Sequence, residues 1–170
     1  MTEQQKYKVV KKFVDFEVRD YESCNIAEVS VDGSMSSAGS YGFRPLFNYI
    51  SQNNISMTAP VIQIPVKNDQ WKISFVMPSG SDIASLPISK NSEVEIKPLP
   101  QGFYACLKFS GNFSKIKLEK NLNLLKSALT RESIKEIGNE NNWRSARFDP
   151  PFKPSFLKRN EIQIPVNWIN

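Results

Sequence analysis

Hydrophobic and polar residues alternate in several short stretches of the chain, which is the pattern of half-buried β-strands. The clearest stretch is the last one, where Ile162, Ile164, Val166 and Trp168 occupy every second position. Prolines interrupt an earlier stretch and predict a bend or a sheet edge there. The strands predicted in this way lie within 13–34 (two strands), 55–66, 70–78, about 93–109 (two strands), near 143–148 and in 161–168.

Two other segments carry apolar residues at the three- and four-residue spacing of an amphipathic helix. Between Ala38 and Gln52 the apolar positions are Phe43, Leu46, Phe47 and Ile50. Between Ser114 and Arg131 they are Leu118, Leu122, Leu125 and Leu129, with lysines on the opposite face. We expect a helix in each segment and a third, short one near 133–137 that Gly138 ends.

Part of this pattern occurs twice. Residues 17–34 align without a gap to residues 95–112, at an offset of 78 positions (95 minus 17). Three identities support the alignment, since Glu17, Ala27 and Gly33 recur as Glu95, Ala105 and Gly111. Both stretches lead from extended chain through glycine into a helical segment. We interpret them as a duplicated β-β-α-β-β unit, at about 13–78 and 93–168, joined by the polar linker 79–92.

Two such units in 170 residues predict one α+β domain over residues 1–170. Pairing the copies would curl their strands into a distorted antiparallel β-barrel flanked by two helices, with a cleft between the copies. No apolar stretch approaches the roughly 20 residues of a membrane span, and the N-terminus lacks the apolar core of a signal peptide. A cytoplasmic protein without a membrane span is therefore expected.

The chain contains no histidine. This excludes Ser-His-Asp and Cys-His nucleophile pairs, zinc sites that use histidine, and a histidine ligand to haem iron. Cys24 and Cys106 are the only cysteines and have no neighbouring ligand at metal-binding spacing, so we interpret them as buried free thiols. No metal site is expected.

The net charge of +5 is unevenly spread. Between residues 144 and 159 only Asp149 opposes the five cations Arg144, Arg147, Lys153, Lys158 and Arg159. Aromatic residues and prolines are interleaved with them, so the segment forms either the basic rim of an apolar cleft or a solvated basic loop. No helix-turn-helix, RNA-binding or zinc-finger pattern is present, and we expect no nucleic-acid binding. A protein partner could dock on the proline-containing loop 149–156.

Three motifs resemble the SOUL haem-binding protein family. They are GFRPLFNYI at 42–50, MTAPV at 57–61 and DPPFKPSFLKRNEIQIPV at 149–166, and FEVRDYESCNIAEV is similar to the family's opening strand pair. The resemblance implies a distorted β-barrel flanked by two helices with internal pseudo-twofold symmetry. It also implies non-covalent binding of haem or another porphyrin in an apolar groove beside the first helix.

The resemblance places Phe43 and Phe47 on the groove and Lys153 near a haem propionate. Two further basic positions of haem-binding members are Ser40 and Asn48 here. The cofactor-binding candidates are thus Phe43, Arg44, Phe47, Met57 and Lys153, with Arg44 close to the helix's basic positions and Met57 a thioether that could ligate iron. The alternative for both phenylalanines and for Met57 is simple core packing.

Two other functions stay open. The chain could bind a different amphipathic small molecule, or act as a scaffold without a ligand. Some relatives in the wider superfamily of two-copy modules hydrolyse their ligands with Glu and Tyr, which here would be Glu161 with Tyr41, Tyr49 or Tyr104. Glu161 can equally form an ion pair with Arg159 or with a lysine of a neighbouring strand. We expect a binding protein and no catalytic residue.

Overall fold

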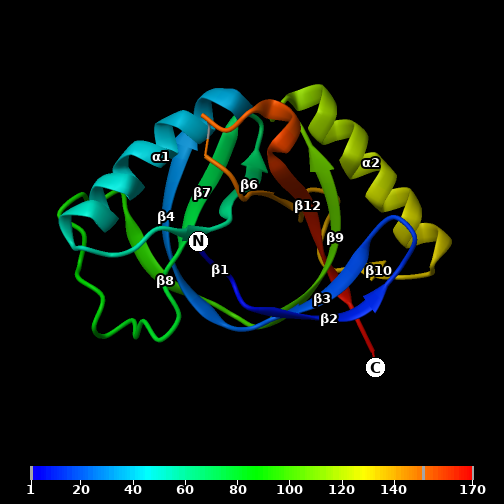
Figure 1. Cartoon of the computed structure of the whole chain (residues 1–170), viewed down its shortest axis with the longest axis horizontal. Helices are drawn as coiled ribbons and strands as arrows, with labels where there is room; N and C mark the ends of the chain where they lie inside the picture. Colours follow the sequence, from blue (N-terminus) through cyan, green and yellow to red (C-terminus); the bar gives the residue numbers. More distant parts are fainter. Residues whose placement is uncertain (1, 151, 170) are drawn as a thin grey trace.

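The computed structural model describes residues 2–150 and 152–169. Two successive sets of elements build the fold (Figure 1). The first set is β3 (Glu17–Tyr21), β4 (Cys24–Asp32), α1 (Met35–Gln52), β6 (Val61–Lys67) and β7 (Gln70–Val76). The second set is β8 (Glu95–Leu99), β9 (Gly102–Ser110), α2 (Lys115–Arg131), β11 (Arg144–Arg147) and β12 (Arg159–Asn167). The remaining elements are β1 (Glu3–Gln4), β2 (Tyr7–Lys12), β5 (Thr58–Ala59), β10 (Lys135–Glu136) and the 3-10 turn η1 (Ser155–Leu157).

The strands of both sets join one antiparallel sheet in the order β2-β3-β9-β12-β11-β6-β7-β4-β8, with β10 added to β12. From β3 to β8 the order is symmetric about its centre. Each strand of the first set lies as far from the centre as its counterpart in the second set, in the pairs β3/β8, β4/β9, β7/β12 and β6/β11. The two sets meet where β6 pairs with β11. The sheet curls into a half-barrel (Figure 1), which confirms the predicted duplicated α+β fold and shows that the barrel is open.

The two sets exchange their first strands. β3 pairs with β9 of the second set, with Val18 opposite Ala105. β8 pairs with β4 of the first set, with Ile96 opposite Ala27. The offset of 78 seen in the sequence relates the strand bounds as well, since β8 and β9 begin and end 78 positions after β3 and β4.

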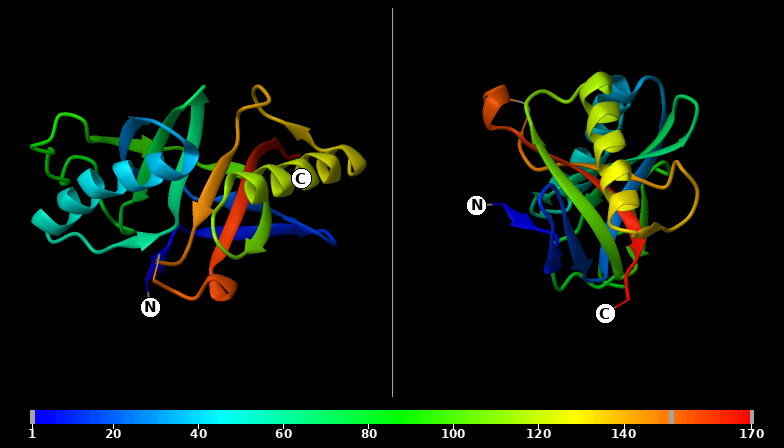
Figure 2. Two further views of the ribbon diagram at one scale, coloured as in Figure 1. Left: turned by 90° about the horizontal axis from the view of Figure 1, so that it is seen from above. Right: turned by 90° about the vertical axis from the view of Figure 1, so that its right-hand side faces the viewer.

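Both helices cover the outer face of the curved sheet (Figures 1 and 2). Each begins at a serine whose Oγ accepts a hydrogen bond from the backbone N–H three residues later, Ser34 for α1 and Ser114 for α2. α1 buries Leu46 and Ile50 against β4 and β7, and α2 buries Leu125 among residues of β9 and β12. Packing by the helices therefore leaves the inner face of the sheet for other contacts.

Three local expectations need correction or extension. The short helix predicted near 133–137 is wrong, because Ser133 adopts a positive φ of 56° and the next residues form β10, which pairs with the end of β12. The predicted bend in 55–66 falls at Pro60, between β5 and β6. β2 has no counterpart among the predicted strands.

No helix of the described residues is long and apolar enough to cross a bilayer. A single domain over residues 1–170 stays a prediction, with both ends outside the described residues.

Candidate ligand-binding site

The outer surface of α1 carries a pair of stacked aromatic rings. Phe43 and Phe47 are 38% and 46% exposed, their ring centroids are 5.7 Å apart and their planes differ by 13°. Phe43 also meets Phe75 of the core edge-on at 5.2 Å. The α1 aromatic pair, as we call Phe43 and Phe47, is therefore anchored on one side and open on the other.

The other candidates near α1 differ in exposure. Arg44, Ser40 and Asn48 are exposed on the same helix. Met57 is partly buried and packs against the core under α1. The helix thus presents an apolar surface with one cation, Arg44, while Met57 makes contacts that are also explained by ordinary packing.

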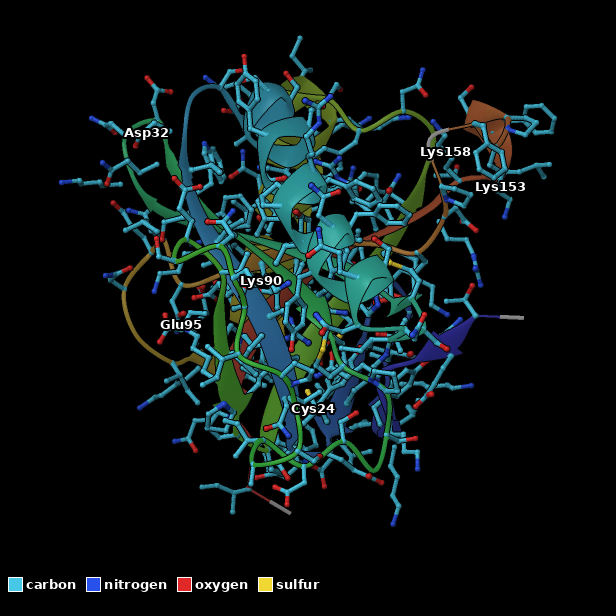
Figure 3. All side chains as sticks on the ribbon, turned by 90° about the vertical axis from the view of Figure 1, so that its left-hand side faces the viewer. Cys24, Asp32, Lys90, Glu95, Lys153 and Lys158 are labelled. Carbon is cyan, nitrogen blue, oxygen red and sulfur yellow. The ribbon has the colours of Figure 1, made fainter. Side chains whose placement is uncertain are left out.

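Lys153 lies on the loop that carries η1, to one side of α1 in Figure 3. Its Nζ is 2.8 Å from Oδ1 of Asp149, and Arg159 reaches the same carboxylate through Nε at 3.0 Å and through its backbone N–H at 2.6 Å. These hydrogen bonds, first of all those from Arg159, hold the pKa of Asp149 well below its ordinary 3.8. The charge of Lys153 is therefore already paired.

The five cations of 144–159 do not form one rim. Arg144 is buried, donates to Oε1 of Gln163 at 2.6 Å and lies 4.1 Å from the ring centroid of Tyr104. Arg147 donates to Oε1 of Gln63 and stacks at 3.9 Å over Phe113, and burial lowers its pKa to about 10. These two arginines bond and stack with other protein groups. The cations of 144–159 as a whole are therefore neither the basic rim of an apolar cleft nor a solvated basic loop.

Glu161 belongs to a buried polar network on the inner face of the sheet. Arg19, which is 0% exposed, holds both carboxylate oxygens of Glu161 at 2.6 and 3.1 Å and contacts Glu17 at 2.7 Å. Gln163 donates to Glu161 and to the hydroxyl of Tyr21, both at 3.0 Å. A bidentate pair of this kind occupies the oxygens that a general base would use.

The tyrosines considered as partners of Glu161 lie elsewhere. Tyr41 is 66% exposed on α1, and Tyr49 donates its hydroxyl proton to the carbonyl of Pro87 at 2.7 Å. Both belong to the helix on the outer face, whereas Glu161 is on the inner face. Tyr104 is on the inner face but meets Tyr21 edge-on at 5.6 Å and stacks with Arg144. The structure therefore brings neither Tyr41 nor Tyr49 to Glu161.

Residues 3–7 cross the inner face, and we call them the N-terminal strap. β1 pairs in parallel with β5, and the buried Gln5 donates its backbone N–H to the carbonyl of Ala59 at 2.8 Å. Its side chain contacts Cys24 Sγ at 3.6 Å and Arg144 at 3.3 Å. The ring of Tyr7 covers the guanidinium of Arg19 at 4.3 Å. The strap therefore shields the buried polar network from solvent.

Two cavities adjoin the strap, and Gln4 lines both. The first, of about 350 Å³, contains mostly polar groups and includes Cys24. The second, of about 550 Å³, lies beside η1. Its lining comprises Gln4, Tyr7, Lys108, Phe109, Ser110, Phe148, Phe156, Leu157, Lys158, Arg159, Asn160 and Glu161. Among the described residues that line these two cavities, none belongs to α1.

Sequence reasoning missed this second cavity. Lys108 and Phe109 lie in a predicted strand and were not recognised as lining residues. Tyr7 begins β2, which the alternation of hydrophobic and polar residues did not predict. The available signal was the run of aromatic and basic residues in 148–159, which predicted a basic apolar cleft but not its position.

The two thiols agree in part with expectation. Cys24 and Cys106 are both free; Cys106 is buried and Cys24 is half-buried. Burial raises the pKa of Cys106 to about 12. Within residues 2–150 and 152–169 no group of three or more His, Cys, Asp or Glu side chains could hold a metal ion.

Several solved structures share this fold at low sequence identity. The C-terminal domain of EcmrR matches with a TM-score of 0.68 at 12% identity, over 96% of this chain and 99% of that chain. A hydrolase from Listeria innocua matches with a TM-score of 0.64 at 12% identity, over 93% and 94%. SAV2435 bound to tetraphenylphosphonium matches with a TM-score of 0.53 at 8% identity, over 91% and 94%. At these identities the likeness concerns the fold alone.

Sequence comparison gives a more specific result. No curated protein sequence matches the chain significantly. The model of the SOUL heme-binding protein family, however, matches residues 2–165, nearly the whole chain. This match includes the helix with the α1 aromatic pair, the MTAPV segment and the loop of Lys153. The chain belongs to the SOUL heme-binding protein family.

Proposed function

We propose that this protein binds haem or a related tetrapyrrole without covalent attachment and without histidine ligation, against the outer face of α1. Family membership supports the ligand class. The observation that carries the proposal is the α1 aromatic pair, whose nearly parallel rings leave a large part of their surface in solvent. A planar macrocycle laid against these rings would remove apolar surface from water at roughly 25 cal/mol per Å².

The candidate side chains on and near α1 match the apolar faces of haem better than its anionic propionates. Arg44 and Phe47 are three residues apart and are neighbours on the helix surface. Arg44 is therefore the first candidate to meet a propionate. Lys153 could contribute only by sharing its ammonium group between Asp149 and the ligand. We infer that burial of the macrocycle supplies most of the affinity and that the cations mainly orient it.

Met57 is the remaining candidate for contact with iron. A thioether is a soft ligand that haem proteins do use. Its packing against the core under α1 means that ligation would require the side chain to turn outward. We therefore treat Met57 as a secondary site residue, and haem bound here would bring a redox-active iron of its own.

The state of Glu161 supports a binding role rather than an enzymatic one. Its carboxylate is engaged by Arg19 and Gln163, so it is not poised to activate water. The proposal also retains the expectation of no nucleic-acid partner. Docking of a protein on the loop 149–156 stays a prediction; Phe152 and Phe156 are exposed there, and residue 151 lies outside the described residues.

Titration of the purified protein with hemin tests the proposal. We expect a Soret shift that saturates at one equivalent, and affinity about fivefold weaker in Phe47→Ala because roughly 1 kcal/mol of apolar contact is lost. Lys153→Ala should weaken binding by about threefold or less, since that lysine is already paired. Phe152→Ala is the control, because this ring is 88% exposed and is not among the candidate site residues.

Metal-free protoporphyrin provides a second arm. If apolar burial dominates, its affinity should lie within about threefold of that for hemin, and Met57→Leu should change neither. Partition of hemin without saturation, or equal losses in Phe47→Ala and Phe152→Ala, would contradict the proposal.

A further inference from the structure

The second cavity lies beside the N-terminal strap, where η1 and the start of β12 lie against the end of β9. Its volume of about 550 Å³ is within the roughly 300–1,000 Å³ typical of small-molecule pockets. The loop that carries η1 is held in place by the Asp149 carboxylate, which accepts bonds from Lys153 and Arg159. These bonds fix the loop beside an open cleft that has no lining residue on α1.

Apolar groups form one side of this cavity. Phe156 and Leu157, on η1, line it while remaining 74% and 50% exposed. Phe148, Phe109 and Tyr7 complete the apolar lining. These large apolar side chains line a concave surface and still face solvent. They become mostly buried only when a ligand covers them.

Cations dominate the charge of the same cavity. Lys108, Lys158 and Arg159 line it, and Glu161 is the one carboxylate in the lining. Arg19 donates two hydrogen bonds to Glu161 and a third to Glu17. Arg159 is neutralised by Asp149.

The two lysines differ from Arg159. Lys158 reaches only the neutral side-chain oxygen of Asn112, at 3.5 Å. Lys108 is exposed, and within the described part of the chain neither lysine forms an ion pair. Neither ammonium group beside this apolar wall forms an ion pair in the described residues, and Glu161, which lies opposite Lys108 on the neighbouring strand, is bound by Arg19.

We propose that this cavity binds a small amphipathic anion, with an apolar body against Phe148, Phe156 and Leu157 and an acidic head group at Lys108 and Lys158. The ligand class is an aliphatic or aromatic acid. Charge complementarity selects the head group, and burial of the exposed rings supplies affinity. This site goes beyond the proposed haem site, because it has no lining residue on α1 and shares no residue with that site.

Two fluorescent probes of nearly the same shape test this site. Anilinonaphthalene sulfonate carries the acidic group, and N-phenylnaphthylamine lacks it. We expect the double change Lys108→Gln with Lys158→Gln to weaken binding of the sulfonate by about tenfold and to leave the neutral probe within about twofold. Phe156→Ala should weaken both probes by about fivefold, because the apolar wall contacts both.

Matched controls are available on nearby surfaces. Lys120→Gln removes an exposed charge from α2, and Phe152→Ala removes an exposed ring from the same loop; neither residue lines the cavity. Both should leave probe affinity unchanged. Absence of binding in the unaltered protein, or losses in the controls equal to those in the cavity variants, would overturn the inference.

Hemin titration keeps the two proposals separable. If both are correct, Phe47→Ala weakens hemin and spares the sulfonate probe, whereas the double lysine variant does the reverse. If the cavity variants weaken hemin and Phe47→Ala does not, haem is itself the amphipathic anion of this cavity. That result would support the cavity and reject the α1 site.

Discussion

At the scale of single residues, the notable feature is how much charge the inner face buries. Arg19 is completely shielded and meets two carboxylates, Glu17 and Glu161. In the other half of the sheet, Glu28 is buried between Lys97 at 2.5 Å and the hydroxyl of Ser74 at 2.9 Å. Buried pairs of this kind tolerate the loss of both members better than the loss of one.

Replacement of Glu161 by Gln should therefore destabilise the protein strongly. It replaces one of the two carboxylate oxygens that accept from the buried Arg19 guanidinium by an amide NH2 and removes the negative charge, which leaves Glu17 as the carboxylate beside Arg19. We expect the free energy of unfolding to fall by about 3 kcal/mol. Urea denaturation followed by circular dichroism measures the change.

The combined change Glu17→Gln, Arg19→Met and Glu161→Leu is the informative control, because it removes all three charges and should cost less than Glu161→Gln alone. A Glu161→Gln protein as stable as the unaltered one would indicate a carboxylate that the fold does not need. Such a result would favour a chemical role for Glu161.

Residue patterns predicted these contacts only in part. The run of cations in 144–159 indicated an unusual segment, but residues two apart on a strand share a face and neighbours do not. The placement of Arg144 on the inner face and Arg147 on the outer one depends on the register of β11 against β12. The pairing register of β11 and β12, which a loop separates in the sequence, is fixed by the packing of the sheet. The local sequence does not predict it.

At the scale of elements, the N-terminal strap was the main surprise. Its sequence, EQQKY, is polar and gives no period-two signal. It is held by side-chain contacts of Gln5 and Tyr7 with groups from distant strands, together with the short pairing of β1 and β5. Such long-range contacts explain why alternation, which reports local burial, predicted β3 and β4 but not the strap.

Loosening the strap should expose Cys24. Gln5→Ala removes the side chain that contacts both Cys24 and Arg144, and we expect a loss of about 1–2 kcal/mol together with faster alkylation of Cys24 in the native protein. The rate of iodoacetamide labelling, resolved by mass spectrometry of peptides, reports the effect.

Cys106 serves as the internal control in the same experiment. It is 1% exposed and its pKa is raised to about 12 by burial, so its thiol stays protonated and shielded at neutral pH. It should label only after unfolding. Parallel acceleration of both cysteines in Gln5→Ala would indicate global destabilisation and contradict a local role for the strap.

At the scale of the whole molecule, the repeat in the sequence predicted the two sets of elements but not how they interlock. The alignment of 17–34 with 95–112 reproduces the bounds of four strands, because a duplicated unit repeats its own local signals. The exchange of β3 and β8 carries no such signal, since a first strand paired within its own set would have the same alternation. Nor could the sequence show that two cavities adjoin the strap.

Strand exchange should make the two halves inseparable under native conditions. A protease site introduced at Lys90–Asn91, in the exposed linker, cuts the chain between the two sets without touching a strand. After cleavage β3 still pairs with β9, β4 with β8 and β6 with β11. We expect both fragments to elute together at the native size in gel filtration and to separate only in denaturant. Each fragment alone would lose a strand from its sheet and expose unpaired edges, which is why association should persist. Separation of the fragments in native buffer would mean that each set is self-contained, and that the interface between the halves holds the half-barrel together less firmly than its pairing indicates.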